Sequence, residues 1–287
     1  MEIEIDKEYD GVRIDRYVKK ILADKPMSLI FKMFKKGDIR LNGKKVKEND
    51  RLSLGDILYI YGKAPNKNIE FIELSQDEME LIKKNIVLED ENFIVFNKPS
   101  KTVMHKGSGF DYGLVEILKS YYKNNDINFV NRLDKDTSGL VIASKNLEYT
   151  RKLAEIIRDR NINKHYYALV KGIPKEKEFK VEVNLLDDGT KTIVVGENKG
   201  KESLTYFKHI KSNKNISLIE CKIESGRKHQ IRVHLSHIGL PILGDNKYGV
   251  RDSKEMFLNS YKLEIEELNL KIDKGIPKDF TDRMNKE

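Results

Sequence analysis

Positive charge is concentrated in one short N-terminal segment, and this feature most limits how the chain can be organised. Residues 13–47 contain twelve Lys or Arg and three acids, so this segment of 35 residues carries a net charge of +9. The whole chain of 287 residues carries +8, which leaves the rest close to neutral. A chain of this length has room for one large domain and a small one. We therefore expect the charge to mark a small basic module that faces a polyanion.

The basic segment has the residue spacing of a small α+β module. A first helix is expected where apolar residues recur at helical spacing, at Ile14, Tyr17, Val18, Ile21 and Leu22. Ser28 can N-cap a second helix, and Gly37 can end it. The Asn42-Gly43 pair favours a tight type I′ hairpin, with a further strand expected over residues 57–61.

Residues 11–62 resemble the alpha-L RNA-binding module, also called the S-four-type domain. The resemblance rests on an R-I-D-R-Y opening, a K-K-G-D-I-R-L-N-G-K centre and a later L-G-D. It implies that basic side chains contact RNA phosphates, which provides affinity and salt dependence but little sequence choice. A solvated charged face on a small domain is the alternative. The side chains expected to bind RNA here are Arg13, Arg16, Lys35, Lys36, Arg40, Lys44 and Lys45.

Residues 63–84 are expected to be a linker, and residues 85–287 a larger domain. Pro65 and a mixture of Asn and Lys indicate the linker. In the larger domain the apolar spacing predicts strands at 94–96, 140–143 and 219–223, and helices at 114–122 and 147–158. These elements follow one another without a regular βαβ repeat. The pattern favours an α+β fold with a mostly antiparallel, mixed sheet flanked by helices and loops.

Three polar or basic clusters interrupt the apolar pattern of the larger domain. From the residues alone, Asn131–Gly139 is a tight polar turn between apolar runs. Lys164–Gly172 is a strand that ends at a glycine. Gly226–Asp245 begins with a short amphipathic helix, whose basic residues are expected to face solvent. None of these clusters by itself indicates catalysis.

In this order, the three clusters resemble the pseudouridine synthase family whose members act on large ribosomal RNA and some transfer RNAs. The pattern R-L-D-x-x-T-S-G is matched at Arg132–Gly139, and K-x-Y-x-A-L-V-x-G at Lys164–Gly172. The pattern G-R-x-H-Q-I-R-x-H-L, followed by G-x-P-I-x-G-D, is matched at Gly226–Asp245. An earlier N-K-P and His105 also agree, so the resemblance covers nearly the whole chain.

Two departures from the family's pattern are visible. Asn131 stands before R-L-D, where the family usually has histidine. Near the C-terminus the chain has Leu258–Ser260, where the family often has L-H-A. Neither departure falls on Asp134, the position that matches the family's nucleophile. They therefore bear on loop hydrogen bonding and substrate choice and leave the reaction class intact.

The resemblance implies that uridine is converted to pseudouridine, with large-subunit ribosomal RNA favoured over transfer RNA because the alpha-L module accompanies synthases of that substrate. In this reaction the N1–C1′ bond breaks, the base turns, and C5 bonds to C1′. Asp134 matches the nucleophilic aspartate, which can attack C1′ or stabilise positive charge there. Arg232 matches the family's basic partner and can pair bidentately with Asp134, which offsets the cost of burying a carboxylate. A phosphate contact is the alternative for Arg232.

Other matched positions fill out the expected pocket. Tyr166 matches the family's tyrosine, whose ring can stack on uracil and whose hydroxyl can take part in removing the C5 proton. Arg132 could occupy the space that a flipped base vacates, with a loop salt bridge as the alternative. Leu235 is expected to form an apolar wall, and His105 to lie in the same pocket. Further expected RNA contacts are Arg227 and Lys228.

Several classes of site are not expected. The chain has neither a phosphate loop nor a dinucleotide fingerprint, and the reaction needs no redox step or group donor, so no cofactor is expected. His229, His234 and His237 lack the H-E-x-x-H spacing, so no metal is expected. The absence of a membrane-length apolar run and of a secretory signal, with Cys221 as the single cysteine, points to a cytoplasmic protein. A monomer is the default expectation.

Other functions stay open at this point. A non-catalytic RNA-binding factor on the same fold would keep the basic module, although the presence of Asp134, Tyr166 and Arg232 weighs against it. A metal-dependent RNA hydrolase would use the histidines and would be sensitive to chelators. Within the synthase class, transfer RNA is the alternative substrate.

Overall fold

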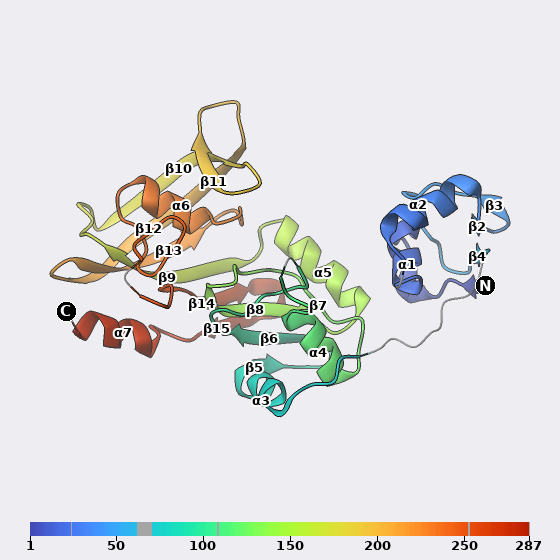
Figure 1. Cartoon of the computed structure of the whole chain (residues 1–287), viewed down its shortest axis with the longest axis horizontal. Coiled ribbons are helices and arrows are strands. Elements are labelled where there is room, and N and C mark those ends of the chain that lie inside the picture. The colour runs from blue at the N-terminus through green and yellow to red at the C-terminus, as the bar shows by residue number, and fades with distance from the viewer. Residues whose placement is uncertain (24, 62–70, 108, 252, 287) are drawn as a thin grey trace. The chain divides into compact units, whose positions relative to one another are not determined.

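The protein forms two compact units, residues 1–71 and 72–287, in a computed structural model (Figure 1). The structure describes residues 1–23, 25–61, 71–107, 109–251 and 253–286. Within these ranges, no helix combines the length and the apolar character that crossing a membrane requires.

The first unit combines two helices with a small antiparallel sheet. The helices are α1 (Ile14–Ile21) and α2 (Met27–Lys36), after a short 3-10 helix η1 (Lys7–Tyr9). The strands are β1 (Glu2–Glu4), β2 (Ile39–Leu41), β3 (Lys44–Lys45) and β4 (Ile57–Ile60), in the order β1-β4-β2-β3. Ile14 and Val18 of α1 and Ile30 of α2 are fully buried, so the apolar helix faces form the core of this unit.

Turn chemistry explains where the elements of the first unit end. Asn42 and Gly43 have φ values of 50° and 77°, and two positive φ angles are what a type I′ hairpin between β2 and β3 requires. Gly37 ends α2 in the left-handed region, at φ 80°, and its N–H donates to carbonyls of the last helical turn. Both features agree with the sequence pattern.

The prediction that Ser28 caps α2 is wrong. The helix begins at Met27, and the residue at its N-cap is Pro26. The Pro26 carbonyl accepts from the N–H groups of Leu29 and Ile30, at 3.0 and 3.3 Å. Because proline fixes its φ near −65° and has no N–H to leave unpaired, the helix starts directly after it.

The predicted linker over 63–84 is wrong in its second half. Residues 62–70 lie outside the described residues, but helix α3 (Gln76–Asn85) occupies most of the rest. Ser75 and Glu78 form a capping box at its start. Ile82 is fully buried in the core of the second unit, and the N–H of Ile72 donates to Ser120 Oγ at 3.0 Å. A short polar helix with one buried contact gives a weak sequence signal, which explains the error.

The second unit is built on an eleven-stranded sheet. Its strands are β5 (Ile86–Glu89), β6 (Phe93–Lys98), β7 (Asn128–Phe129), β8 (Ser138–Ser144), β9 (Asn163–Lys171), β10 (Glu178–Asp187), β11 (Thr192–Val195), β12 (Lys201–Asn213), β13 (Ile216–Ile223), β14 (Leu258–Ile265) and β15 (Leu270–Asp273). The main order is β11-β10-β12-β13-β9-β14-β8-β6-β5, with β15 on β14 and β7 on β8. Among these pairs β14 and β8 run parallel and the others antiparallel, so the predicted mixed, mostly antiparallel sheet is confirmed.

Helices cover both faces of this sheet. They are α4 (Leu114–Tyr122), α5 (Leu147–Arg158), α6 (Gln230–His237) and α7 (Lys278–Asn285), with η2 (Glu266–Leu268). Alternate residues of β6 divide between two cores: Ile94 and Phe96 pack with α4 and α6, whereas Phe93 and Val95 pack with α5. In Figure 1, α6 lies over the β10–β13 part of the sheet, and it packs on β11 and β12.

The parallel junction between β8 and β14 depends on a glycine. Gly139 pairs with Ser260 and has a φ of 115°, a conformation that favours glycine. A Cβ at this position would lie 2.3 Å from the Ser260 carbonyl oxygen. The glycine therefore lets β14 approach the start of β8, directly after the loop that carries Asp134.

Candidate active site

Asp134 lies in the loop between β7 and β8, and contacts on both sides hold this loop in place. Leu133, the preceding residue, is buried in the core. On the other side, the Lys98 ammonium donates to the Lys135 carbonyl at 3.0 Å, and Ser100 Oγ donates to the next carbonyl at 2.8 Å. The Asp134 side chain is 26% exposed, so a firmly held loop presents the carboxylate at a surface that a ligand can reach.

Arg232 on α6 is the centre of a buried charge network. Its Nη1 donates to Asp134 Oδ2 at 2.9 Å, while Nε and Nη2 donate to the two oxygens of Asp245, each at 2.8 Å. The predicted contact between Arg232 and Asp134 is present, but its expected bidentate geometry is wrong. The bidentate partner is Asp245, because the planar guanidinium has enough N–H groups to bind both carboxylates at once.

The network is charged. Burial disfavours the cation of Arg232, but the hydrogen bonds and charges of Asp245 and Asp134 hold its pKa above the usual value. Burial also opposes ionisation of Asp245, and Arg232 with the N–H groups of Lys247 and Tyr248 holds the pKa of that carboxyl below its usual value. Asp245, whose side chain is 1% exposed, thus fixes Arg232 in the orientation that reaches Asp134.

His229 and Tyr248 complete the surroundings of the network. His229 Nε2 lies 3.7 Å from Asp134 Oδ2, and its Nδ1 is 2.9 Å from the Tyr248 hydroxyl. The Arg232 guanidinium lies over the Tyr248 ring, 5.1 Å from its centroid. Burial and nearby cations lower the pKa of His229 in spite of Asp134, which favours the neutral imidazole.

The turn before α6 is fixed by Gln230. Its Oε1 accepts from the Arg227 N–H and from Ser225 Oγ, at 3.1 and 2.8 Å. Its Nε2 donates to the Leu204 carbonyl and to Thr205 Oγ1 on β12, at 2.9 and 3.0 Å. This amide, 3% exposed, joins the turn to the sheet and so sets the position of the whole helix that carries Arg232.

The histidines at and within α6 have separate surroundings. His234 is fully buried, its Nε2 lies 2.8 Å from Ser203 Oγ, and burial lowers its pKa to about 4. It is therefore a neutral core residue, unlike His229 beside Asp134. Across the described ranges, no three His, Cys, Asp or Glu side chains converge as a metal site would require.

Tyr166 lies on β9, next to the network. Its side chain is 6% exposed and packs in the main core. Burial, with the charge of Asp134, raises the pKa of Tyr166, so its hydroxyl is protonated at neutral pH. His165 and Tyr167 alternate with it and point to the opposite face of the sheet.

A cleft of about 1310 Å³ in the second unit contains the predicted catalytic residues. Asp134, Tyr166 and Arg232 line it together, from the β7–β8 loop, β9 and α6. The other predicted residues that also line it are Arg132, His105, Arg227 and Lys228. Three motifs separated by up to about a hundred residues are therefore brought to one surface.

Leu235 does not line this cleft, and its prediction as an apolar wall is wrong. The side chain is 0% exposed and belongs to the main core cluster. Leu133, Ile231 and Leu258 supply apolar wall in its place. Ile231 lies one turn earlier than Leu235 on α6, and the earlier turn is the one that meets the cleft.

Arg227 and Lys228 are exposed at the edge of the cleft. Arg227 Nε donates to the Glu202 carbonyl at 3.2 Å, and Lys228 pairs with Asp187 at 2.8 Å. The basic residues of this turn face solvent as expected, whereas Arg232 of the helix itself is 6% exposed and faces inward. The sequence left two roles open for Arg232, a pair with Asp134 and a phosphate contact. Its burial beside Asp134 favours the pair, whereas Arg227 and Lys228 lie at the surface.

In the first unit, some of the predicted RNA-binding side chains form hydrogen bonds within the protein and others are exposed to solvent. Arg13 makes two hydrogen bonds to Asp15, at 3.1 and 2.8 Å, and Arg40 donates to the Gly37 carbonyl at 3.2 Å. The side chains of this set that are exposed are Arg16, Lys35, Lys36, Lys44 and Lys45.

Lys98, in the N-K-P motif, is a buried lysine whose structural role the motif does not reveal. The side chain is 0% exposed and its ammonium donates to the carbonyls of Pro99, Thr102 and Lys135, at 2.8 to 3.0 Å. Burial lowers the pKa of Lys98 to about 7, against the charges of Asp136 and Asp134. It ties β6 to the loop that carries the carboxylate.

The two departures from the family pattern have structural roles. Asn131 Oδ1 accepts from the N–H of Ile142 at 2.8 Å, which fixes the start of the Asp134 loop on β8. Asn259 Nδ2 donates to Ser138 Oγ at 2.8 Å, across the parallel junction of β14 and β8. Asn131 holds backbone in place and Asn259 joins side chains of two strands, and neither forms a hydrogen bond to Asp134.

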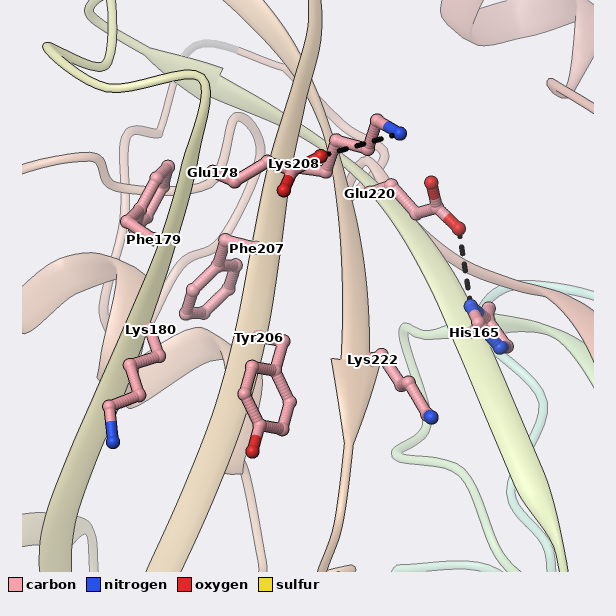
Figure 2. Close-up of a pocket in the computed structure, with 9 residues that line it drawn as sticks. All are labelled: His165, Glu178, Phe179, Lys180, Tyr206, Phe207, Lys208, Glu220 and Lys222. Atoms are coloured by element: carbon pink, nitrogen blue, oxygen red, sulfur yellow. Dashed lines mark hydrogen bonds and ion pairs between the residues drawn. The ribbon is translucent and has the colours of Figure 1, made fainter.

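A second, smaller hollow of about 490 Å³ lies on the other face of the same strands (Figure 2). A hydrogen bond joins His165 and Glu220 at 3.1 Å in it, and an ion pair joins Lys208 and Glu178 at 3.5 Å. Because His165 and Tyr166 alternate on β9, this hollow faces away from Asp134. Its charges are largely paired, and it is separate from the cleft that contains Asp134.

Comparison with known proteins agrees with the site. The sequence pattern of the RNA pseudouridylate synthase family matches residues 92–237, which include Asp134, Tyr166 and Arg232. Ribosomal large subunit pseudouridine synthase C of Buchnera aphidicola (subsp. Baizongia pistaciae) is 37% identical over 262 residues, covering 88% of this chain and 81% of the relative. The enzyme of the same name from Escherichia coli K12 is 33% identical, covering 84% and 77%.

Solved structures share the fold. Human RNA Pseudouridylate Synthase Domain Containing 1 superimposes with a TM-score of 0.60 and 23% identity, over 73% of this chain and 87% of that chain. Human RNA Pseudouridylate Synthase Domain Containing 4 also has a TM-score of 0.60, at 22% identity, over 71% and 92%. With sequence motifs, fold and relatives in agreement, the chain belongs to the RNA pseudouridylate synthase family, whose enzymes isomerise uridine to pseudouridine in RNA.

Proposed function

We propose that this enzyme modifies one or more uridines of large-subunit ribosomal RNA, with Asp134 as the nucleophile. The observation that carries the catalytic assignment is the hydrogen bond from Arg232 to Asp134 Oδ2 within the cleft. The choice of RNA rests on the relatives, which bear the name ribosomal large subunit pseudouridine synthase C.

The geometry around Asp134 suits attack at a sugar carbon. Oδ2 is held by Arg232, while Oδ1 has no hydrogen bond within the described part of the chain. A carboxylate with one oxygen held and the other available can bind C1′ or stabilise positive charge there as the N1–C1′ bond breaks. The hydrogen bond from Arg232 keeps the carboxylate aimed, and Asp245 keeps Arg232 in position.

Tyr166 is proposed to hold the uracil ring. Its raised pKa supports packing against the base over removal of the C5 proton, because a neutral phenol is a weak base. Arg132, exposed at the cleft, is proposed to fill the stack that the flipped uridine leaves.

The first unit is proposed to be an alpha-L module that binds RNA through exposed lysines. These side chains are Lys35, Lys36, Lys44 and Lys45. Isomerisation exchanges one glycosidic bond for another in the same nucleotide and consumes no donor, so the proposed reaction needs no cofactor. We also propose that the enzyme is a cytoplasmic monomer.

The test is release of tritium from large-subunit ribosomal RNA that carries tritium at uridine C5 and lacks pseudouridine. We expect release by the intact enzyme and a loss of at least about 10⁴-fold in Asp134→Ala and Asp134→Asn, because both remove the nucleophile. Circular dichroism and thermal unfolding of both variants control for folding. A variant that kept a rate within tenfold of the intact enzyme would refute the role of Asp134.

The same assay distinguishes the substrates. Release from transfer RNA without release from ribosomal RNA, free or in subunit particles, would overturn the choice of RNA and leave the mechanism standing. Release from neither RNA, with tight binding to one of them, would favour a non-catalytic RNA-binding factor.

A further inference from the structure

Lys164 is a cation in the catalytic cleft that the mechanism above does not use. It lies on β9 two residues before Tyr166, so both side chains point to the same face of the strand. Both line the cleft. Its Nζ lies 3.8 Å from the place that a Cβ on Gly226 would occupy, next to the turn that leads to α6.

No anionic partner accompanies Lys164. Among the described residues no carboxylate forms an ion pair or hydrogen bond with it, and burial lowers its pKa with no carboxylate nearby to oppose this. Four acids line the cleft: Asp134 pairs with Arg232 and Asp187 with Lys228, and among the described residues neither Asp136 nor Glu224 forms an ion pair with Lys164. A half-buried ammonium without a counter-charge is costly, and an anionic ligand would remove that cost.

The position of Lys164 favours a phosphate over the uracil ring. Two residues along a strand separate it from Tyr166 by roughly 6–7 Å, a distance that a ribose spans between its base and its phosphate. Arg158 and Arg160, both exposed, also line the cleft, so further cations are available to neighbouring phosphates. A single ammonium on a flexible stem is also a good phosphate ligand.

We propose that Lys164 binds the phosphodiester next to the target uridine and so holds the flipped nucleotide while Asp134 faces its sugar. This inference rests on the proposed function, because it assigns a substrate contact within the same cleft. Lys164 is thereby a substrate-binding residue that acts on affinity and on its salt dependence.

The experiment compares the intact enzyme with Lys164→Met, Lys164→Arg and Lys222→Met. Lys222 is a matched control: it lies on the adjacent strand β13 and points to the opposite face, in the hollow of Figure 2. Single-turnover tritium release from large-subunit ribosomal RNA gives the enzyme concentration at half-maximal rate. It is measured at 50 and 200 mM salt.

A phosphate contact predicts two changes in Lys164→Met. The half-maximal concentration rises about tenfold at 50 mM salt, as expected for the loss of one charge-assisted hydrogen bond. Raising the salt to 200 mM then weakens the variant about threefold less than the intact enzyme, because one fewer counterion is released. Lys164→Arg and Lys222→Met should stay close to the intact enzyme in both measurements.

The contrary outcomes are distinct. A fall in the maximal rate with unchanged salt dependence would show that Lys164 acts on the uracil or on the local fold, and would overturn the phosphate assignment. Unchanged kinetics would overturn any substrate contact.

Binding of a uridine oligonucleotide by the same four proteins, over the same salt range, separates this inference from the choice of RNA. A reduced salt dependence in Lys164→Met alone supports the contact even if large-subunit RNA is not the substrate. If neither the salt dependence of oligonucleotide binding nor that of turnover changes, the proposal fails while the proposed function stands.

Discussion

The cations of the two units are handled in opposite ways. In the first unit Lys35, Lys36, Lys44 and Lys45 are exposed on α2 and β3. In the second unit Lys98 and Arg232 are buried, and each donates three hydrogen bonds to fixed acceptors. The first arrangement leaves charge free to meet an external anion, and the second uses charge to hold a reactive group in place.

The difference shows what burial adds to a charge. Exposed cations are screened by salt over about 10 Å, so they supply affinity that depends on ionic strength. A buried cation must be fully paired because its desolvation is expensive, and that pairing fixes its geometry. Removing a buried partner should therefore disturb both stability and rate, whereas removing exposed cations should change RNA affinity alone.

Asp245→Asn should give the largest effect among tests of this comparison. It leaves the Arg232 guanidinium with one carboxylate in place of two, so we expect a loss of about 3 kcal/mol in the free energy of unfolding. We also expect a fall of at least about a hundredfold in the rate of tritium release, because Arg232 is no longer held toward Asp134. Urea unfolding and single-turnover kinetics measure the two effects.

Asp187→Asn serves as the control for Asp245→Asn, since it removes an exposed acid at the edge of the same cleft. Its stability should match that of the intact enzyme. If Asp245→Asn proved as stable and as fast as the control, the buried network would not be what positions the nucleophile.

Among the buried cations, Lys98 should make the stability of the protein depend on pH. Its pKa is about 7 in the folded protein and has its ordinary value near 10.5 in the unfolded chain. Between these values the unfolded chain binds more protons, so the contribution of Lys98 to stability rises with pH above 7. From pH 7 to 9 the intact enzyme should gain roughly 2 kcal/mol relative to Lys98→Met, measured by urea unfolding. A stability difference that stays constant over this range would show that the ammonium stays charged when buried.

The exposed half of the comparison is tested by changing Lys35, Lys36, Lys44 and Lys45 together to Gln. If each lysine contacts one phosphate, the slope of log affinity against log salt should fall by about 3. The maximal rate at saturating enzyme and the free energy of unfolding should not change. Filter binding over 50 to 200 mM salt makes the measurement, and an unchanged slope would place RNA binding elsewhere on the protein.

The smallest effect is expected for Lys228→Gln, which changes an exposed cation at the edge of the cleft that contains the buried network. Lys228 is exposed and pairs with exposed Asp187, and such pairs contribute little to stability. The free energy of unfolding should stay within experimental error of the intact value. A clear loss of stability would show that charges at the edge of the cleft are coupled to the buried network.

Periodicity predicted the regular elements well where the burial of the second unit is deep. The helices over 114–122 and 147–158 have the predicted bounds, and the strand at 94–96 lies within β6. The N-cap of α2 was predicted at Ser28, but Pro26 is the residue at this position. Helix α3 was not predicted, because it buries few side chains and so has a weak apolar pattern. At both places the alternative local structures differ by little free energy, and tertiary contacts decide which one forms.

The site was predictable as a set of residues but not as a network. Asp134, Tyr166 and Arg232 were identified by their motifs, and the cleft brings them together. That Asp245 takes two of the N–H groups of Arg232 follows from the path of the chain after α6, and that His229 lies beside Asp134 follows from the turn before this helix. No spacing in the sequence encodes those distances.

By itself, the sequence determined the reaction family, the division into a basic part and a larger part, and the mixed sheet, because motifs, charge and periodicity are local properties of the chain. The tertiary structure alone decided which cations are buried and with which acids they pair. Arg227 and Arg232 are five residues apart in one motif, yet one faces solvent and the other is 6% exposed. Burial depends on what the rest of the fold packs against each side chain, and that sum of distant contacts is absent from any local pattern.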